Sequence, residues 1–287
     1  MRIHAIQTGT VAIKERQRHG VGHGLRRRLN TLVDKVWTEP LPIYAWVIEH
    51  PEGIIVVDTG ETARATEPGY FPWWHPYYRL NVRIWVRPEE EIGPQLQALG
   101  IKPADIRWVV LTHLHTDHAG GLQHFPKVEI LVSLTEYQQA SGLGGRMNGY
   151  LRNRWPEWFD PHLIDFAPQP FGPFPSSYTL TQAGDVVLVP TMGHTAGHLS
   201  VIVQDSNMSI FLAGDTSYTQ QLLLDGVVDG VSESDEAAKQ TIGCIQTYLA
   251  TVPAIYLPSH DPESVVRLEN RSVVSVASDK IPVTQIQ

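Results

Sequence analysis

The stretch LTHLHTDHAGG, residues 111–121, places three histidines and one aspartate within six consecutive positions. It completes the apolar run RWVVLTH, residues 107–113, which predicts a strand, so the polar side chains cluster where that strand ends. Imidazole nitrogens suit zinc, iron and similar metals, and a carboxylate can complete the ligand shell. Burying such a cluster without a metal would leave several polar groups unsatisfied. The stretch therefore predicts a metal site.

Three further apolar runs end in a residue that can bind a metal. VVLVPTMGH reaches His194, SIFLAGD reaches Asp215 and AIYLPSH reaches His260. Rigid scaffolds commonly present catalytic side chains on loops at strand ends. Seven ligands are too many for one tetrahedral ion but suit two. The simplest partition assigns Asp215 as a two-oxygen bridge between one ion held by His113, His115 and His194 and another held by Asp117, His118 and His260.

The distribution of apolar residues indicates an α/β fold. Short β-branched runs predict strands at residues 43–50, 53–60, 107–113, 128–133, 185–191, 199–205, 209–215 and 254–261. Helical patterns occupy 89–99 and 234–250, the latter with Ala238, Ile242, Ile245 and Leu249 on one face. Near-continuous apolar strands with helices between them predict sheets covered by helices. No low-complexity linker interrupts the chain, so residues 1–287 are expected to form a single domain.

The composition excludes several classes of protein. Hydrophobic residues make up 42% and charged residues 18%, with a net charge of −8, which disfavours nucleic-acid and anionic-membrane binding. The single cysteine, Cys244, excludes an internal disulfide framework and a cysteine-based zinc site. We expect a cytoplasmic protein without membrane association, because residues 1–17 lack signal-peptide features and no apolar run approaches about 18 residues.

Two segments depart from the average composition. Residues 14–35 carry seven basic and two acidic side chains. This pattern favours a solvated basic arm, the alternative being an arm that contacts the acidic body of its own or a neighbouring chain. Residues 61–88 carry seven aromatic rings and four prolines without periodicity, so no regular helix is expected. Since exposed rings are costly, an aromatic lid, a pocket wall or a subunit contact is favoured over a self-packed surface loop, and we expect a homodimer.

The motif His113-Leu114-His115-Thr116-Asp117-His118 resembles the HxHxDH motif of the metallo-β-lactamase superfamily. The turn Asp58-Thr59-Gly60, the segment PTMGHTAGH and the closing SHD extend this resemblance over most of the chain. The resemblance implies a four-layer αβ/βα sandwich with the metal site at the edge of two sheets. It assigns the first histidine of PTMGHTAGH, His194, as the ligand. His198 then supports the site from outside the ligand set or serves the structure.

Within that superfamily, the chain resembles the N-acyl-homoserine lactonase family, whose members act in quorum quenching. HLHTDHAGG, GHTAGH and Asp215-Thr216-Ser217-Tyr218 carry this resemblance, the last with a tyrosine three residues after the bridging aspartate. Asp215 also resembles the aspartate that true β-lactamases lack. Thr116 stands where some members have a bulky aromatic residue that contacts substrate, so Thr116 is a predicted substrate contact that bears on acyl-chain preference.

The predicted chemistry is lactone opening by a hydroxide shared between two divalent ions, since metal binding lowers the pKa of water to about 7. The hydroxyl of Tyr218 could donate to the developing oxyanion, or Tyr218 could simply pack. Asp117 is the nearest candidate for a proton shuttle and could also act as a ligand only. Asp58 could orient a ligand histidine or be an ordinary turn aspartate. Cys244 is interpreted as an inert core residue.

Other functions remain open at this stage. The nearest are a glyoxalase-II-like thioesterase, another lactonase or an organophosphate hydrolase of the same fold. A glutathione thioester would require a basic patch, and residues 262–287 contain only Arg267, Arg271 and Lys280. A non-catalytic metal-binding protein is the alternative from another class. We expect two divalent ions per chain, with zinc first and cobalt, manganese or iron as alternatives.

Overall fold

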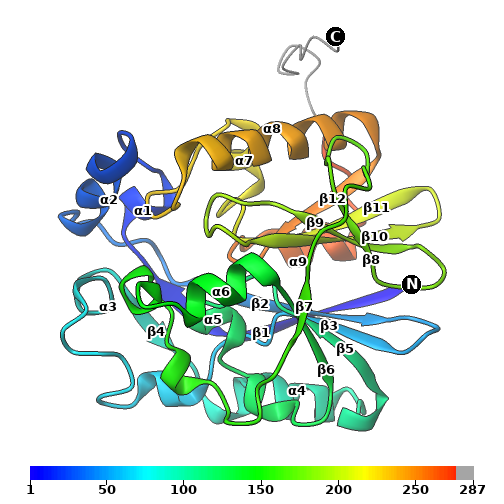
Figure 1. The fold of residues 1–287 in the computed structure, drawn as a ribbon, viewed down its shortest axis with the longest axis horizontal. Coiled ribbons are helices and arrows are strands. Elements are labelled where there is room, and N and C mark those ends of the chain that lie inside the picture. The colour runs from blue at the N-terminus through cyan, green and yellow to red at the C-terminus, as the bar shows by residue number, and fades with distance from the viewer. Residues whose placement is uncertain (276–287) are drawn as a thin grey trace.

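The computed structural model describes residues 1–275, in which two sheets face each other between layers of helices (Figure 1). The larger sheet has the order β4-β1-β2-β3-β5-β6-β7. Its strands are β1 (Arg2–Ala12), β2 (Leu41–Glu49), β3 (Ile54–Val57), β4 (Arg83–Trp85), β5 (Ile106–Val110), β6 (Glu129–Ser133) and β7 (His162–Ile164). The smaller sheet has the order β12-β11-β10-β9-β8. Its strands are β8 (Tyr178–Thr179), β9 (Val186–Pro190), β10 (Leu199–Asp205), β11 (Met208–Gly214) and β12 (Ala254–Pro258).

Central strands such as β2, β3 and β9 are almost wholly apolar because both faces of each sheet are covered. In β2, Tyr44 and Trp46 point into the core between the sheets, whereas Ala45 and Val47 point to the helix-covered face. Val201 of β10 likewise joins the core between the sheets. Removing a large apolar side chain from water contributes roughly 1.5–3 kcal/mol. Burial on both faces explains why the runs do not alternate with polar residues.

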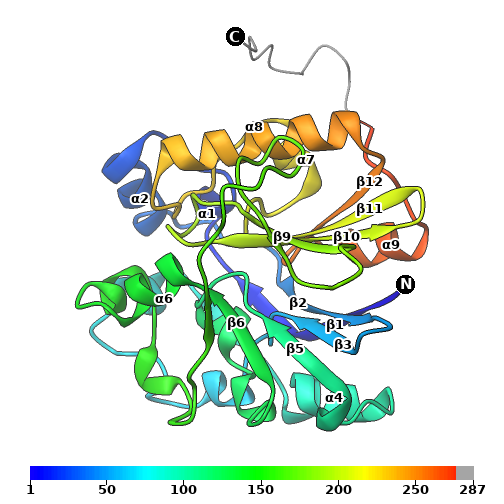
Figure 2. The ribbon, with the colours of Figure 1, turned by 45° about the vertical axis from the view of Figure 1, so that its right-hand side comes forward.

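Helices cover the outer face of each sheet (Figure 2). Ile242, Ile245 and Leu249 of α8 pack on the smaller sheet, and Ile92 and Leu96 of α4 pack on the larger one. The resulting order of helix, sheet, sheet, helix confirms the predicted αβ/βα sandwich. The α-helices are α1 (Glu15–Arg18), α2 (Gly24–Leu32), α3 (Pro76–Leu80), α4 (Ile92–Ala98), α5 (Thr116–Ala119), α6 (Leu134–Ser141), α7 (Gln220–Leu224), α8 (Asp235–Thr251) and α9 (Ser264–Glu269).

The element boundaries differ from the predicted ones where packing overrides local pattern. The edge strands β4, β7 and β8 have two or three residues each and no periodicity to detect. The sequence pattern also does not predict the long strand β1, because polar residues such as Gln7 and Thr8 interrupt its apolar pattern. The predicted helix 89–99 is divided, since Glu91 has an extended ψ of 151° between a 3₁₀ turn at Pro88–Glu90 and α4. The remaining 3₁₀ turns are Ala63–Thr66, Pro103–Asp105, Leu122–His124, Gly145–Asn148 and Arg152–Arg154.

The basic segment 14–35 folds back on the body of the chain. Arg27 of α2 is only 2% exposed and forms an ion pair with Asp235 at 2.8 Å. Its guanidinium also donates to the carbonyl oxygen of Ser232 at 2.8 Å. The interpretation as a solvated arm is therefore wrong for Arg27, because this charge is matched within the same chain.

The aromatic segment 61–88 contains a short helix that the sequence pattern does not predict. Pro76 starts α3 at a position where its missing N–H costs nothing. The rings of Phe71 and Tyr78 stack with centroids 4.5 Å apart, while Trp73 is 79% exposed. The segment thus packs partly on itself and partly presents rings to solvent. Among residues 1–275, no helix has both the length and the apolar character required to cross a membrane.

Candidate metal centre

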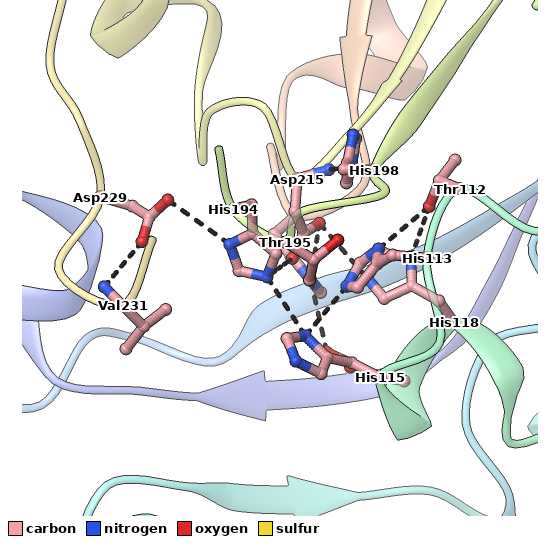
Figure 3. A network of polar contacts seen from close by, with 12 residues as sticks. Thr112, His113, His115, His118, His194, Thr195, His198, Asp215, Asp229 and Val231 are labelled. Carbon is pink, nitrogen blue, oxygen red and sulfur yellow. Dashed lines mark hydrogen bonds and ion pairs between the residues drawn. The ribbon is translucent and has the colours of Figure 1, made fainter. Parts of the chain in front are cut away.

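The seven predicted ligands meet where strand ends of both sheets converge. Figure 3 labels His113, His115, His118, His194 and Asp215 among them. From the larger sheet, β5 leads into His113 and His115, and α5 begins immediately afterwards with Asp117 in its first turn. From the smaller sheet, the other ligands follow their strands directly or after a short loop. They are His194 after β9, Asp215 after β11 and His260 after β12. The tertiary structure therefore brings together residues that lie up to 147 positions apart.

Two groups of three ligand-type residues share no member, and a third group of His113, His118 and Asp215 links them. One group is His113, His115 and His194, and the other is Asp117, His118 and His260. Within each group, the potential ligand atoms lie within 4.8 Å of one another. The first two groups have the same members as the predicted partition, and the assignment of one ion to each stays a prediction.

The carboxylate of Asp215 lies between these groups. Its Oδ1 is 3.2 Å from His118 Nε2 and 3.4 Å from His260 Nε2, while its Oδ2 is 3.6 Å from His194 Nε2. Burial alone would raise the pKa of Asp215, but the neighbouring His260 and His118 imidazoles outweigh it and hold the pKa well below its usual range. One oxygen therefore faces each group, as a bridging carboxylate requires.

Each histidine of the two groups uses one ring nitrogen to contact the protein and directs the other into the cluster. This arrangement is typical of metal ligands, whose outer nitrogen is held by a carboxylate, a carbonyl or a hydroxyl. The outer contacts are His113 Nδ1 with Thr112 Oγ1 (3.2 Å), His115 Nε2 with Asn148 O (3.1 Å), His118 Nδ1 with Asp58 Oδ2 (2.8 Å), His194 Nδ1 with Asp229 Oδ2 (3.4 Å) and His260 Nδ1 with Pro42 O (2.8 Å).

Two buried atoms show that this cluster fits metal ions. His118 Nε2 and Asp215 Oδ1 are inaccessible to solvent, and neither makes a well-directed hydrogen bond within residues 1–275. His113 Nε2 and His115 Nδ1 also face each other at 3.0 Å. Burial, together with the neighbouring His118, lowers the pKa of His113 well below its usual value, which favours a neutral ring with a free lone pair. Nitrogen and oxygen donors of this kind match divalent transition metals.

Asp58 and His198 lie just outside the ligand set. Asp58 Oδ1 accepts the backbone N–H of Thr112 at 2.8 Å, and its Oδ2 contacts His118. The backbone of Asp58 has a φ of +60°, a conformation that aspartate tolerates better than most residues. Both ring nitrogens of His198 contact other groups of the protein: Nε2 accepts the backbone N–H of Asp215, and Nδ1 lies 2.9 Å from Thr191 Oγ1.

A cavity of about 270 Å³ opens beside the cluster. His115, Asp117, His194, Asp215 and His260 form its metal-facing end. The predicted substrate contacts Thr116 and Tyr218 both line it. Tyr218 is 5% exposed, and its ring stacks on His260 with centroids 5.7 Å apart. Tyr77 and Tyr78 of the aromatic segment form part of the wall.

The family comparison agrees with this geometry. Residues 38–260 match the sequence model of the metallo-beta-lactamase superfamily, which is more than three quarters of the chain. The chain belongs to the metallo-beta-lactamase superfamily. This assignment confirms the family predicted from the HxHxDH motif.

Relatives within the metallo-beta-lactamase superfamily include named lactonases. The N-acyl homoserine lactonase AttM of Agrobacterium fabrum is 26% identical over 92% of this chain and 94% of its own length. An N-acyl homoserine lactonase of Bacillus thuringiensis is 30% identical over 65% of this chain and 68% of its own. A probable metallo-hydrolase of Mycobacterium tuberculosis is 31% identical over 64% of this chain, and the chain spans 58% of that relative's length.

A solved metallo-beta-lactamase-fold structure confirms the architecture. It is an N-acyl homoserine lactone hydrolase with the product N-hexanoyl-L-homoserine bound at its catalytic metal centre. Its TM-score is 0.73 at 22% identity, with 92% of this chain and 94% of the other covered. At this identity the likeness establishes the fold.

Sequence reasoning missed three residues that the metallo-beta-lactamase fold brings to the site. Asp229 contacts His194, Glu61 is fully buried near Asp117, and Gln17 lines the cavity. Gln17 lies in the basic segment 14–35, and Asp229 lies in the loop before α8. None of the three sits in a ligand-spacing motif, so no local signal could have identified them.

Proposed function

We propose that this protein is a metal-dependent hydrolase that opens the lactone ring of N-acyl homoserine lactones. The observation that carries the proposal is a cavity with mostly apolar walls beside the cluster of seven ligand-type side chains. Val11, Ile13 and Ile84 line the wall, which suits an acyl chain. Full-length similarity to a named N-acyl homoserine lactonase supports the same substrate class.

We propose two divalent ions per chain, zinc in the first place. His113, His115 and His194 would hold one, and Asp117, His118 and His260 the other, with Asp215 between them. Bound ions would supply Lewis acidity, which polarises a carbonyl oxygen and lowers the pKa of water.

The protein's own side chains would complete the reaction. The hydroxyl of Tyr218 lies on the cavity wall next to the cluster and can donate to the oxygen of the carbonyl under attack. Asp117 Oδ2 lies 3.4 Å from His260 Nε2 on the same wall and can carry a proton to the departing ring oxygen. The apolar wall excludes water from the acyl chain and orients the ring towards the cluster.

The cavity disfavours the thioesterase alternative. Arg28 is the only lysine or arginine among the lining residues in the described part of the chain. A glutathione thioester carries two carboxylates, which would need matching cations. The neutral acyl lactone requires none.

We also propose a cytoplasmic homodimer. Exposed rings such as Trp73 (79%) and Trp74 (42%) support an association surface, because such rings are costly to leave in water. The single cysteine agrees with a reducing compartment.

A substrate panel tests the proposed function. Ring opening releases one acid equivalent, so a pH-stat assay reports it directly for acyl homoserine lactones of different chain length. A thioester, a phosphotriester and a β-lactam complete the panel. We expect acyl lactones to give the highest kcat/KM; a higher value for any other member would reject the proposal. The His118→Ala variant, which removes a ligand from the cluster, serves as the inactive reference.

A further inference from the structure

The side-chain amide of Gln17 contacts two tyrosines at once. Its Nε2 lies 2.7 Å from the hydroxyl of Tyr77 and 2.8 Å from that of Tyr218. Gln17 is 2% exposed, and its backbone carbonyl accepts the N–H of Gly230 at 2.6 Å. The amide is therefore held in place from α1, far in sequence from both tyrosines.

Hydrogen-bond counting decides which end of the amide faces the tyrosines. With Nε2 towards them, both N–H groups are satisfied, and only Oε1 lacks a partner within residues 1–275. The reverse orientation would leave two buried N–H donors without acceptors, which costs more free energy. Gln17 is thus the donor in both contacts, and the two hydroxyl oxygens accept.

This direction leaves both hydroxyl protons free. Neither Tyr77 nor Tyr218 donates its hydroxyl proton to any group in the described chain, and both residues line the cavity. By contrast, the neighbouring Tyr78 donates its proton to the carbonyl of Gly149 at 2.5 Å. The fork of a planar amide places its two acceptors about 5 Å apart. The cavity therefore presents two phenol donors at a defined spacing.

We propose that Gln17 positions Tyr218 and Tyr77 as a pair of donors, Tyr218 for the lactone carbonyl and Tyr77 for the carbonyl of the acyl amide. This rests on the proposed function. An acylated homoserine lactone carries these two carbonyls a few ångströms apart, with the connectivity of successive peptide carbonyls. Tyr218 takes the lactone because it stacks on His260 beside the cluster. Tyr77 would then select lactones that bear an acylamino group.

Two substrates separate the roles. N-hexanoyl homoserine lactone has both carbonyls, and γ-caprolactone has only the one in the ring. Tyr77→Phe should raise the KM for the acyl homoserine lactone about threefold to tenfold, which is the effect of losing one neutral hydrogen bond. The KM for γ-caprolactone should change less than twofold. Tyr218→Phe should lower kcat on both substrates. Tyr137 is partly buried and stacks on Trp155 outside the cavity lining; Tyr137→Phe is the matched control and should change neither KM nor kcat.

Variants at Gln17 test the direction of the contacts. Gln17→Glu is nearly isosteric but accepts both hydroxyl protons, so it should reduce kcat/KM on the acyl lactone more than either tyrosine variant does. Gln17→Met removes both hydrogen bonds to the tyrosines without offering an acceptor in their place, so it should reduce kcat/KM less than Gln17→Glu does. It also provides the test if the Gln17→Glu variant does not fold. Metal content and the melting temperature of each variant are measured alongside.

The outcomes are distinguishable. A Tyr77→Phe variant that affects both lactones equally, or a folded, metal-loaded Gln17→Glu variant with wild-type kinetics, would overturn the inference and leave the proposed function intact. Wild-type protein that opens neither lactone would overturn both.

Discussion

The backbone N–H of Asp215 donates to Nε2 of His198 at 3.0 Å. Two histidines four residues apart therefore contact different groups. His194 Nε2 lies 3.2 Å from His115 Nδ1 in the cluster, whereas His198 accepts from the main chain that carries Asp215. Burial, with the neighbouring His194, lowers the pKa of His198 to about 3, so its ring is neutral and can accept. Gly214 is required beside it, because its φ is +56° and a Cβ there would lie 2.6 Å from His198 Nε2.

The two histidines should therefore respond differently to substitution. His194→Ala should reduce the metal content from two ions per chain to one, because it removes a ligand from one group. His198→Ala should retain two ions and lower the melting temperature. Elemental analysis after dialysis, combined with thermal unfolding, checks both. Loss of an ion only in the His198 variant would show that the assignment of the ligand is reversed.

Asp229 should increase the metal affinity of the group that contains His194, although it is not itself a predicted ligand. Its Oδ2 contacts His194 Nδ1, and its Oδ1 accepts the N–H groups of Val231 and Ser232 at 2.7 and 2.6 Å. Asp229→Asn should weaken affinity for one ion about 10-fold to 100-fold, as loss of such outer contacts typically does. Competitive chelation measures the change. Asp225→Asn, four residues earlier and outside the cluster, is the control, and equal effects of both variants would contradict the role of Asp229.

The hydroxyl of Tyr218 should contribute to kcat and not to metal binding. Tyr218→Phe should lower kcat on acyl lactones roughly 10-fold to 100-fold, less than loss of a sole oxyanion donor, because the metal shares the charge. If Tyr218 also assists departure of the ring oxygen, the variant should lower kcat less on an aryl ester than on a lactone. The leaving group of an aryl ester departs without such assistance. Unchanged kcat on lactones at full metal content would reduce Tyr218 to a packing residue.

Glu61 should make the stability of the metal-free protein depend on pH. Burial, with a smaller contribution from the charge of Asp117, raises the pKa of Glu61 to about 8. This folded-state pKa exceeds the value in the unfolded chain. The contribution of Glu61 to the free energy of unfolding is therefore complete below about pH 4.3 and is lost as the pH rises towards 8. Glu61→Gln, which stays neutral, should flatten this decline.

Thermal unfolding of the metal-free protein between pH 5 and 9 measures this effect of Glu61. The exposed Glu157→Gln variant is the control and should follow the wild-type profile. If the melting temperature of Glu61→Gln changes with pH in parallel with that of the wild type, the carboxyl group of Glu61 is not protonated in the folded protein.

The exposed ring of Trp73 should contribute to association between copies of the chain. Trp73→Ala should lower the molecular mass in solution from dimer to monomer at micromolar concentration, with little change in melting temperature, because the ring contacts little within its own chain. Trp158→Ala, exposed at 39% elsewhere on the surface, is the control. Light scattering gives the mass, and a monomeric wild type would refute the dimer.

The sequence by itself determined that apolar strands form sheets covered by helices and that ligand-type side chains follow the ends of several of these strands. Strands buried on both faces leave uninterrupted apolar runs, and a ligand that follows such a run must emerge at a sheet edge, as His113, Asp215 and His260 do. Four ligands also lie within six residues, so their proximity is local. These features follow from covalent spacing and strand geometry alone.

Only the tertiary structure decided what surrounds those ligands. Gln17 and Tyr218 are 201 residues apart, and Asp58 and His118 are 60 apart. Each pair meets because packing of the two sheets and the return of α1 onto the body bring separate loops together. Glutamine and aspartate are common in turns and on surfaces, so their residue type carries no local signal for such a role. Their function comes from burial and hydrogen-bond direction, which depend on the whole fold.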